Sequence, residues 1–487
     1  MTVLSLTVFL PLLAAALLAV PRLPACWIWV AAAAADLVLV VVMWLGYRGG
    51  IGYEERLRWI PSVGAGYHVG VDGLSLPLIA LTAVLFLSCA IYSLTQAERP
   101  KSYAALFLFL QTVSTGLFAA LDLLLFFVFF DLSIVGMYFV IVGWGHGDRA
   151  RSALKFFLYT FLGSLALLLG FIGLYLGSDP RTFDIVDLTA SPPEAGALVL
   201  LAVGIGLAVK TPTVPFHTWL PPAHTDAPAA GSAILAGILL KMGTYGFARI
   251  ALPLLPGPWR QYAWVIIVVG VVSVLYGALV ALAQQNIKRL IAYTSVNHMG
   301  YIVLALGAAG LAAGDVQARQ LAVTGAVTQM VSHGLITGAL FLLTGILWDR
   351  AHSYDLDRFG GIAASARTFT LMTAVAAFAS LGLPGLSGFI AEFQIFAGVI
   401  GTGMTGAVVA GGLSIVGILI TAALLLRLLQ KAFLGPLGEL RVSEAQPHEV
   451  ASIAPLLVLS LVIGIVPGWL LDFIEPFSAA LVTGVSR

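Results

Sequence analysis

The chain has 487 residues, of which 60% are hydrophobic and only 10% are charged, and its formal net charge is +1. This composition supplies too little polar surface to cover soluble domains of this size, and the near-zero charge gives no sign of a nucleic-acid partner. Two cysteines in separate apolar runs exclude a disulfide framework and a cysteine-ligated metal cluster. The composition therefore predicts a membrane protein.

Apolar runs long enough to cross the hydrocarbon recur along the whole chain. At about 1.5 Å per residue, a helix needs about 20 apolar residues to span it. No Lys or Arg precedes the first run, which predicts an uncleaved first span rather than a signal peptide. On this criterion the sequence predicts an all-α polytopic membrane protein with about 14 transmembrane helices, at residues 2–21, 26–46, 74–96, 103–120, 122–145, 152–177, 195–219, 229–252, 261–284, 287–311, 320–348, 369–400, 407–433 and 450–475.

The distribution of Lys and Arg predicts the orientation of these spans. Cytoplasmic loops are enriched in both residues, and an even number of spans places both termini on one side of the membrane. We therefore expect both termini on the non-cytoplasmic side. Most basic residues lie in the loops and helix ends that follow the odd-numbered spans: Arg22, Arg99, Lys101, Arg149, Arg151, Lys155, Lys288, Arg289, Arg350, Arg358, Arg367, Arg427, Lys431 and Arg441.

Two lysines, Lys210 and Lys241, lie inside predicted spans and belong to no loop, and three acids inside predicted spans share this problem: Asp36, Asp131 and Glu392. An unpaired charge at mid-membrane costs about 3 kcal/mol on insertion scales, so such residues face the protein interior, pair with one another, or mark an ion path. Asp36 lies beside an alanine run, which favours a structural role. For the two lysines, structural ion pairs and a proton path are the competing interpretations.

Two of the predicted spans are interrupted next to such a charge. The stretch TPTVP, which ends at Pro215, follows Lys210, and LGLPGLSG, which contains Pro384, precedes Glu392. A cation at the end of one half-helix and an anion at the start of another each face a favourable helix dipole. Matched breaks in two halves are typical of a transporter binding site, although a simple proline kink is the alternative for each break alone.

The two breaks lie five spans apart, in spans 7 and 12. Because five is an odd number, corresponding spans of the two halves cross the membrane in opposite directions. This predicts inverted repeats of five helices each, formed by spans 4–8 and 9–13. The chain then divides into an N-terminal three-helix segment (1–102), a first repeat (103–252), a second repeat (253–433) and a C-terminal loop with the last span (434–487).

Four motifs resemble the antiporter-like membrane subunits of respiratory complex I: KTPTVPFHTWLPPAHTDAPAAGSAILAGILLKMGTYG, QQNIKRLIAYTSVNHMGYI, TQMVSHGLITGALF and LGLPGLSGFIAEF. The resemblance runs across essentially the whole chain and is greatest to the M-type branch. Glu392 favours this branch, because the L-type, N-type and related Mrp antiporter subunits typically carry lysine there. A Mrp-type cation/proton antiporter, a subunit of a ferredoxin- or hydrogenase-linked complex, and a membrane spacer that has lost pumping are the alternatives.

The resemblance implies a proton path. Asp131 matches the acid that pairs with Lys210, Lys241 matches the central lysine, and Glu392 matches the residue that exchanges protons with the outside. The other matching residues are His298 and His333 on the connecting path, and His217, His224, Pro215 and Pro384 in supporting positions. Protonation or movement within the first pair would alter the proton affinity of Lys241, which passes a proton through the histidines to Glu392.

The resemblance also implies where the chain works and with what. We expect a bacterial-type plasma membrane, neighbouring antiporter-like subunits and lipid as partners, and no nucleic acid. The sequence contains no dinucleotide-binding fingerprint, P-loop or cluster-type cysteine set. Flavin, iron–sulfur clusters and quinone are therefore expected on other subunits, with no cofactor or metal on this chain.

Some residues depart from the family pattern. Asp131 replaces a glutamate and is one methylene shorter, so a water molecule could bridge it to Lys210. Gly136, Pro222, Asp226 and Asn286 replace the usual Pro, Asp, Glu and Asp.

Overall fold

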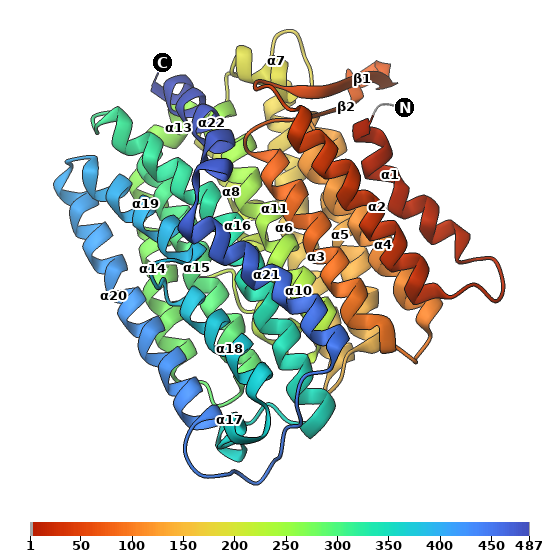
Figure 1. Ribbon diagram of the computed structural model, residues 1–487. Coiled ribbons are helices and arrows are strands. Elements are labelled where there is room, and N and C mark those ends of the chain that lie inside the picture. Colours follow the sequence, from red (N-terminus) through yellow and green to blue (C-terminus); the bar gives the residue numbers. More distant parts are fainter. Residues whose placement is uncertain (1–2, 487) are drawn as a thin grey trace.

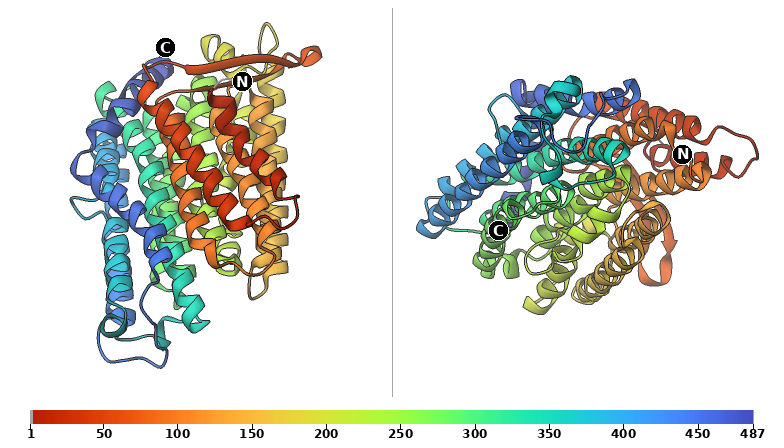
Figure 2. Two further views of the ribbon diagram at one scale, coloured as in Figure 1. Left: turned by 45° about the vertical axis from the view of Figure 1, so that its right-hand side comes forward. Right: turned by 90° about the horizontal axis from the view of Figure 1, so that it is seen from below.

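Twelve helices within residues 3–486, the part of the chain that the computed structural model describes, are long and apolar enough to cross a membrane. They run between two ends of one bundle (Figures 1 and 2). The all-α polytopic prediction is confirmed, while the count of 14 and the repeat boundaries stay predictions. The 12 are α2 (Ala25–Gly46), α3 (Ser75–Tyr92), α4 (Pro100–Ala119), α5 (Leu123–Trp144), α6 (Arg149–Leu176), the run Ala229–Leu254, α14 (Ala263–Leu282), α15 (Ile287–Ala309), α16 (Val316–Ala351), α20 (Thr405–Leu428), α21 (Pro447–Ile465) and α22 (Gly468–Ser486).

Shorter helices complete the bundle. The N-terminal helix α1 has 15 residues, and both ends of the chain lie at the upper end of the bundle in Figure 1. We call this end the terminal face, and the opposite end, where α17 lies, the loop face. The shorter helices are α1 (Val3–Leu17), α7 (Ile185–Ala190), α8 (Ala197–Lys210), α9 (Leu220–Asp226), α13 (Pro256–Gln261), α17 (Ile362–Ser365), α18 (Arg367–Ser380) and α19 (Ser387–Gly401).

The last predicted span, 450–475, is wrong in its extent. Helix α21 ends at Ile465 and a second helix, α22, begins at Gly468. Pro467 has no N–H to continue the helical hydrogen bonds and disfavours helical backbone at the preceding residue. The C-terminal segment therefore contains two helices where the apolar pattern predicted one.

The polar segment 47–73 contains a β-hairpin that the sequence analysis treated only as a loop. Strands β1 (Gly52–Ile60) and β2 (Ala65–Val71) pair antiparallel over the terminal face (Figure 1). Gly64 closes the turn with a φ of 68°, a left-handed conformation that favours glycine. The alternation of this segment is weak, because several residues on both faces of β1 are exposed.

His68 anchors this hairpin to the segment that leads into α7. Its Nδ1 lies 2.6 Å from Asp184 Oδ2, its Nε2 lies 2.9 Å from Glu54 Oε1, and Arg56 lies 3.0 Å from the same Asp184 oxygen. Burial alone would lower the pKa of His68, but the hydrogen bonds and attraction from the two carboxylates raise it above its ordinary value of 6.5. The hairpin is thus held by a buried imidazole between two acids.

Both predicted helix breaks are present. Helix α8 ends at Lys210, residues 211–219 are non-helical, and α9 begins at Leu220. Helix α18 ends at Ser380 and α19 begins at Ser387. Gly382 (φ 74°) and Gly385 (φ 94°) turn the second break through backbone conformations that other residues rarely adopt.

Lys241 lies in the buried centre of the bundle, on the helical run from Ala229 to Leu254. This run consists of α10 (Ala229–Ile234), a π-helical turn η3 (Leu235–Leu239), α11 (Leu240–Gly246), a second π-helical turn η4 (Phe247–Ala251) and α12 (Leu252–Leu254). Such turns are often found at functional sites because they distort the regular hydrogen bonding. The run packs against α16, the long central helix in Figure 1.

Candidate functional site

Lys210 is held at the C-terminal end of α8 by a serine. Its side chain is buried, and its Nζ donates a 2.8 Å hydrogen bond to Ser133 Oγ and lies 4.7 Å from the centre of the Phe130 ring. Asp131 lies on helix α5, which also carries Phe130 and Ser133, but its Oδ1 has no hydrogen-bond partner among residues 3–486. Ser133, rather than the Asp131 carboxylate, is therefore the hydrogen-bonded partner of Lys210.

Lys241 makes two short contacts in the centre of the protein. Its fully buried Nζ donates to the backbone oxygen of Ala236 at 2.6 Å, within the π-helical turn η3. The same atom lies 2.5 Å from Nδ1 of His333, which α16 contributes from 92 residues further along the chain. The π-helical turn η3 and the neighbouring helix α16 thus both fix the position of the Lys241 amine.

His298 continues this contact toward the second helix break. The rings of His333 and His298 have their centres 5.2 Å apart. Nε2 of His298, on α15, lies 3.2 Å from the backbone oxygen of Ser380, the last residue of α18, and 3.7 Å from Oε1 of Glu392 on α19. The second broken helix therefore brings its acid to the histidine.

Gly382 makes room for Glu392 at this break. A β-carbon at position 382 would lie 2.4 Å from Oε2 of Glu392, so any other residue would displace the carboxylate. Gly382 therefore turns the chain and also leaves the space in which the Glu392 carboxylate contacts this turn. Lys241, His333, His298 and Glu392 form one continuous buried row, which we call the central row.

The supporting residues do not all join the central row. His224, on α9, is fully buried and stacks on Phe341 with ring centres 4.5 Å apart. His217 lies in the first break beside Tyr276, with ring centres 4.9 Å apart. Pro215 and Pro384 lie within the two breaks.

Asp36 has the structural surroundings that the sequence analysis favoured. It is fully buried on α2 and accepts a 2.7 Å hydrogen bond from Nε2 of Gln111 on α4. Neither residue belongs to the central row.

The segments that carry Lys210 and Lys241 are in contact at Gly243. A β-carbon on Gly243 would lie 2.3 Å from Oγ1 of Thr211, the residue directly after Lys210. Since Gly243 is two residues beyond Lys241, the end of α8 packs directly on the helix that carries the central lysine.

Sequence reasoning missed three polar residues at these centres, because each acts through a contact between distant parts of the chain. Ser133 accepts from Lys210, and Ser380 offers its carbonyl to His298. Lys288 was assigned to a loop and helix end but is fully buried, and it donates to the backbone oxygen of Ala227. A serine two residues after an intramembrane acid was the only sequence signal for the first.

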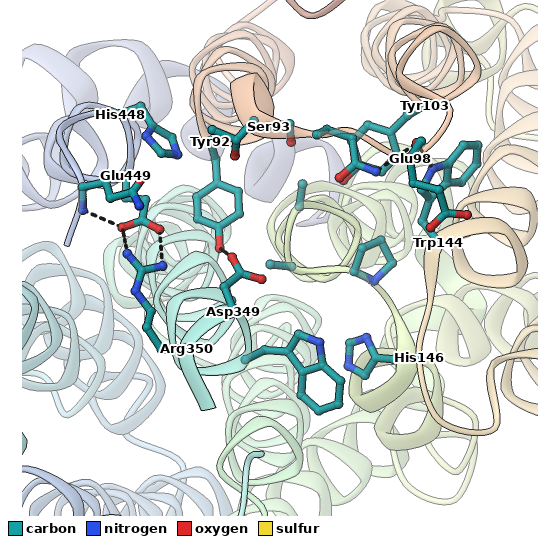
Figure 3. A pocket seen from close by; sticks show the side chains of 18 of the residues that line it. Tyr92, Ser93, Glu98, Tyr103, Trp144, His146, Asp349, Arg350, His448 and Glu449 are labelled. Carbon is teal, nitrogen blue, oxygen red and sulfur yellow. Dashed lines mark hydrogen bonds and ion pairs between the residues drawn. The ribbon is translucent and has the colours of Figure 1, made fainter. Parts of the chain in front are cut away.

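A polar cavity of about 670 Å³ opens at the loop face (Figure 3). Arg350 and Glu449 form an ion pair at its wall, with Nη1 and Oε1 2.6 Å apart, and the Tyr92 hydroxyl donates to Asp349 at 3.2 Å. Its lining includes Pro228, Ala229 and Ala230, the start of the helical run that carries Lys241. The cavity thus reaches the loop-face end of the run that carries Lys241.

Comparison with known proteins gives a consistent result. Residues 120–420 match the family model described as NADH:quinone oxidoreductase/Mrp antiporter, transmembrane. NADH-quinone oxidoreductase subunit M of Rickettsia prowazekii is 38% identical over 428 residues, covering 86% of this chain and 84% of the relative. Subunit M of Rhodobacter capsulatus is 37% identical over 509 residues, covering 98% and 96%.

Solved structures of two membrane complexes contain chains with the same fold as this one. A chain of respiratory complex I from Thermus thermophilus superimposes with a TM-score of 0.91 at 29% identity, covering 99% of this chain and all of that one. A chain of the Mrp complex from a Dietzia species superimposes with a TM-score of 0.88 at 22% identity, covering 100% of both chains, which is a likeness of fold.

Proposed function

Because this chain belongs to the NADH:quinone oxidoreductase/Mrp antiporter transmembrane family, we propose that it is the M subunit of a bacterial NADH:quinone oxidoreductase and translocates protons. Electron transfer would take place on other subunits, which carry flavin, iron–sulfur clusters and quinone. Neighbouring antiporter-like membrane subunits are its expected partners. The observation that carries the proposal is the central row itself, in which Lys241, His333, His298 and Glu392 lie next to one another in the buried interior.

The two histidines of the central row point the same way, as a proton relay requires. His333 presents Nδ1 to Lys241, and His298 presents Nε2 to Glu392. The remaining nitrogens, Nε2 of His333 and Nδ1 of His298, have no hydrogen-bond partner within residues 3–486. A neutral imidazole carries one proton and accepts on its other nitrogen, so each ring can accept on Nδ1 and release from Nε2.

Proton transfer along this row leaves the net charge unchanged. A proton leaves the Lys241 ammonium for Nδ1 of His333, the proton on Nε2 of His333 passes to Nδ1 of His298, and the proton on Nε2 of His298 passes to Glu392. A single water molecule between the rings would complete the second step. The row starts with a cation and an anion and ends with two neutral groups. In a low-dielectric interior this exchange avoids building up an isolated charge.

Lys241 would be reloaded from the loop face. The 670 Å³ cavity there reaches the first residues of its helical run, and most of the loop cations lie at this end. We therefore place the loop face in the cytoplasm and both termini on the non-cytoplasmic side. Movement or protonation in the Asp131–Ser133–Lys210 group would act on Lys241 through the contact at Gly243 and through charge.

Lys241→Ala tests the proposal in the assembled complex. Removing the amine deletes the first donor of the row, so proton pumping in membrane vesicles should be lost and NADH-driven quinone reduction substantially lowered. Asp36→Asn is the control, since it neutralises an equally buried acid outside the row. Wild-type pumping by an assembled Lys241→Ala complex would contradict the proposal.

A Mrp-type antiporter subunit is the second candidate, favoured by the full-length superposition on a chain of the Mrp complex. A ferredoxin-linked complex is a related possibility. Purification in mild detergent and identification of the co-purifying subunits separate these assemblies from an NADH:quinone oxidoreductase.

A further inference from the structure

The helical run that carries Lys241 continues to the terminal face with two polar residues in line. Lys241, Tyr245 and Arg249 are spaced four residues apart, which places them on neighbouring turns of one helical face. Nε of Arg249 donates to the Tyr245 hydroxyl at 3.1 Å, and that hydroxyl donates to the backbone oxygen of Phe118 at 3.0 Å. Tyr245 is fully buried, and Arg249 is 9% exposed.

Arg249 ends this line in a buried ion pair with Asp72. Its Nη2 lies 2.5 Å from Asp72 Oδ1, and the guanidinium lies 5.5 Å from the centre of the Phe477 ring on α22. The same carboxylate oxygen accepts from the backbone N–H groups of Leu74 and Ser75, both at 3.0 Å, and so caps the start of α3. The pair is therefore fixed from three elements.

Asp72 also lines a cavity of about 520 Å³ at the terminal face, together with Tyr47, Arg48 and Asp472. This cavity ends at the ion pair, and Arg249 is not among its lining residues. On the far side of Arg249 come Tyr245 and then Lys241. Along this run, only two side chains thus separate the central lysine from a cavity that has charged residues in its lining, on the side opposite the loop-face cavity.

A direct connection here would bypass the central row. If Lys241 exchanged protons with both cavities, protons would run back through the subunit without passing Glu392. A guanidinium keeps its proton in proteins and offers no acceptor, so it cannot relay a proton. The guanidinium end of the pair faces Tyr245 on the Lys241 side and Asp72 lies on the cavity side, so a proton that leaves Lys241 meets the positive end first and is repelled.

We propose that the Arg249–Asp72 ion pair is an electrostatic seal that closes the direct route from Lys241 to the terminal face. The seal directs the proton sideways along the central row. This inference rests on the proposed proton translocation through Lys241. The opposing interpretation, that Asp72 is a second exit for the proton, requires transfer through Arg249.

The test is the passive proton leak of the purified, assembled complex in liposomes that contain a pH-sensitive dye, with no NADH present. The double variant Asp72→Asn/Arg249→Gln removes both charges, keeps polar side chains and leaves no unpaired buried charge. We expect its leak to rise about tenfold, which corresponds to about 1.4 kcal/mol in the barrier. Adding Lys241→Ala to the double variant should lower the leak again, because the route runs through the lysine.

Two matched controls sharpen the result. Arg249→Lys keeps a positive charge but supplies an amine that can release its proton, so its leak should lie between those of the wild type and the double variant. Arg319→Gln removes another buried guanidinium, one that donates to the backbone oxygen of Ala309 and to Ser486 on different helices, and should not leak.

A tight, assembled double variant would overturn the seal. A complex with Asp72→Asn alone that assembles, stays tight and loses pumping would show instead that Asp72 is an exit. The pumping assay on Lys241→Ala alone reports separately on the proposed function, so the two failures are distinguishable.

Discussion

Ser133→Ala removes the hydroxyl that accepts the hydrogen bond of Lys210 at 2.8 Å. Lys210 is 1% exposed, so bulk water cannot replace that acceptor. The Phe130 ring, whose centre lies 4.7 Å from the Lys210 Nζ, then remains as a favourable contact of the ammonium. The variant therefore separates the role of the serine from that of the neighbouring acid.

The expected loss follows from the kind of bond removed. A hydrogen bond to a charged group contributes about 1.5–3 kcal/mol, whereas a cation–π contact contributes about 0.5–2 kcal/mol. Losing the former lowers the equilibrium ratio of the charged to the neutral form of Lys210 by about 10- to 150-fold. Since the coupling step uses that charge, pumping per assembled complex should fall by at least about tenfold.

The assay is dye-quenching in membrane vesicles, normalised to assembled complex. Ser133→Thr is the matched control, because it keeps the hydroxyl and should retain most of the pumping. A double-mutant cycle should give a larger coupling energy for Ser133 with Lys210 than for Asp131 with Lys210. Full pumping by an assembled Ser133→Ala complex would refute this account of how Lys210 is held.

Two further predictions concern the neighbouring acid and the hairpin. Asp131→Glu should preserve pumping, because a side chain about 1.5 Å longer reaches toward Lys210, whereas Asp131→Asn should impair it severely; normal pumping by the Asn variant would make Asp131 a structural residue. The pKa of His68 is raised in the folded protein, so the stabilisation of the hairpin by Asp184 and Glu54 should be complete below pH 6.5 and lost as the pH rises through the folded pKa. Hydrogen exchange of the hairpin amides against pH should show this loss in the wild type, and an unchanged profile in His68→Gln would argue against it.

The helices and their breaks could be predicted because both depend on local chemistry. The length of an apolar run decides whether it crosses the membrane, and the prolines and glycines after Lys210 and before Glu392 end the helices where they stand. Pro467 obeys the same rule and splits the last predicted span. The apolar pattern alone did not reveal this break, because the residues on both sides of it are hydrophobic.

The partners of the buried charges could not be predicted, because they come from packing between distant segments. The choice of Ser133 over Asp131 depends on side-chain reach across two helices. The orientation of the His333 and His298 rings depends on the turn η3 and on the end of α18. Lys288 was assigned to a loop and helix end, yet the bundle buries it fully, and the sequence analysis did not single out Arg249, which is also buried.

The distance between the two lysine centres is set by a residue with no side chain. The break after Lys210 leaves Thr211 at the buried C-terminal end of the half-helix α8, and Gly243 lets that end lie against the helix of Lys241, where a β-carbon would come within 2.3 Å of the threonine hydroxyl. Without the contact at Gly243, the break after Lys210 would only loosen the end of α8, and Lys241 would only be a buried lysine. Because break and glycine meet, a movement at Lys210 must be felt within one helical turn of Lys241, while the fixed charge of Arg249 two turns further on gives the proton no shorter way out.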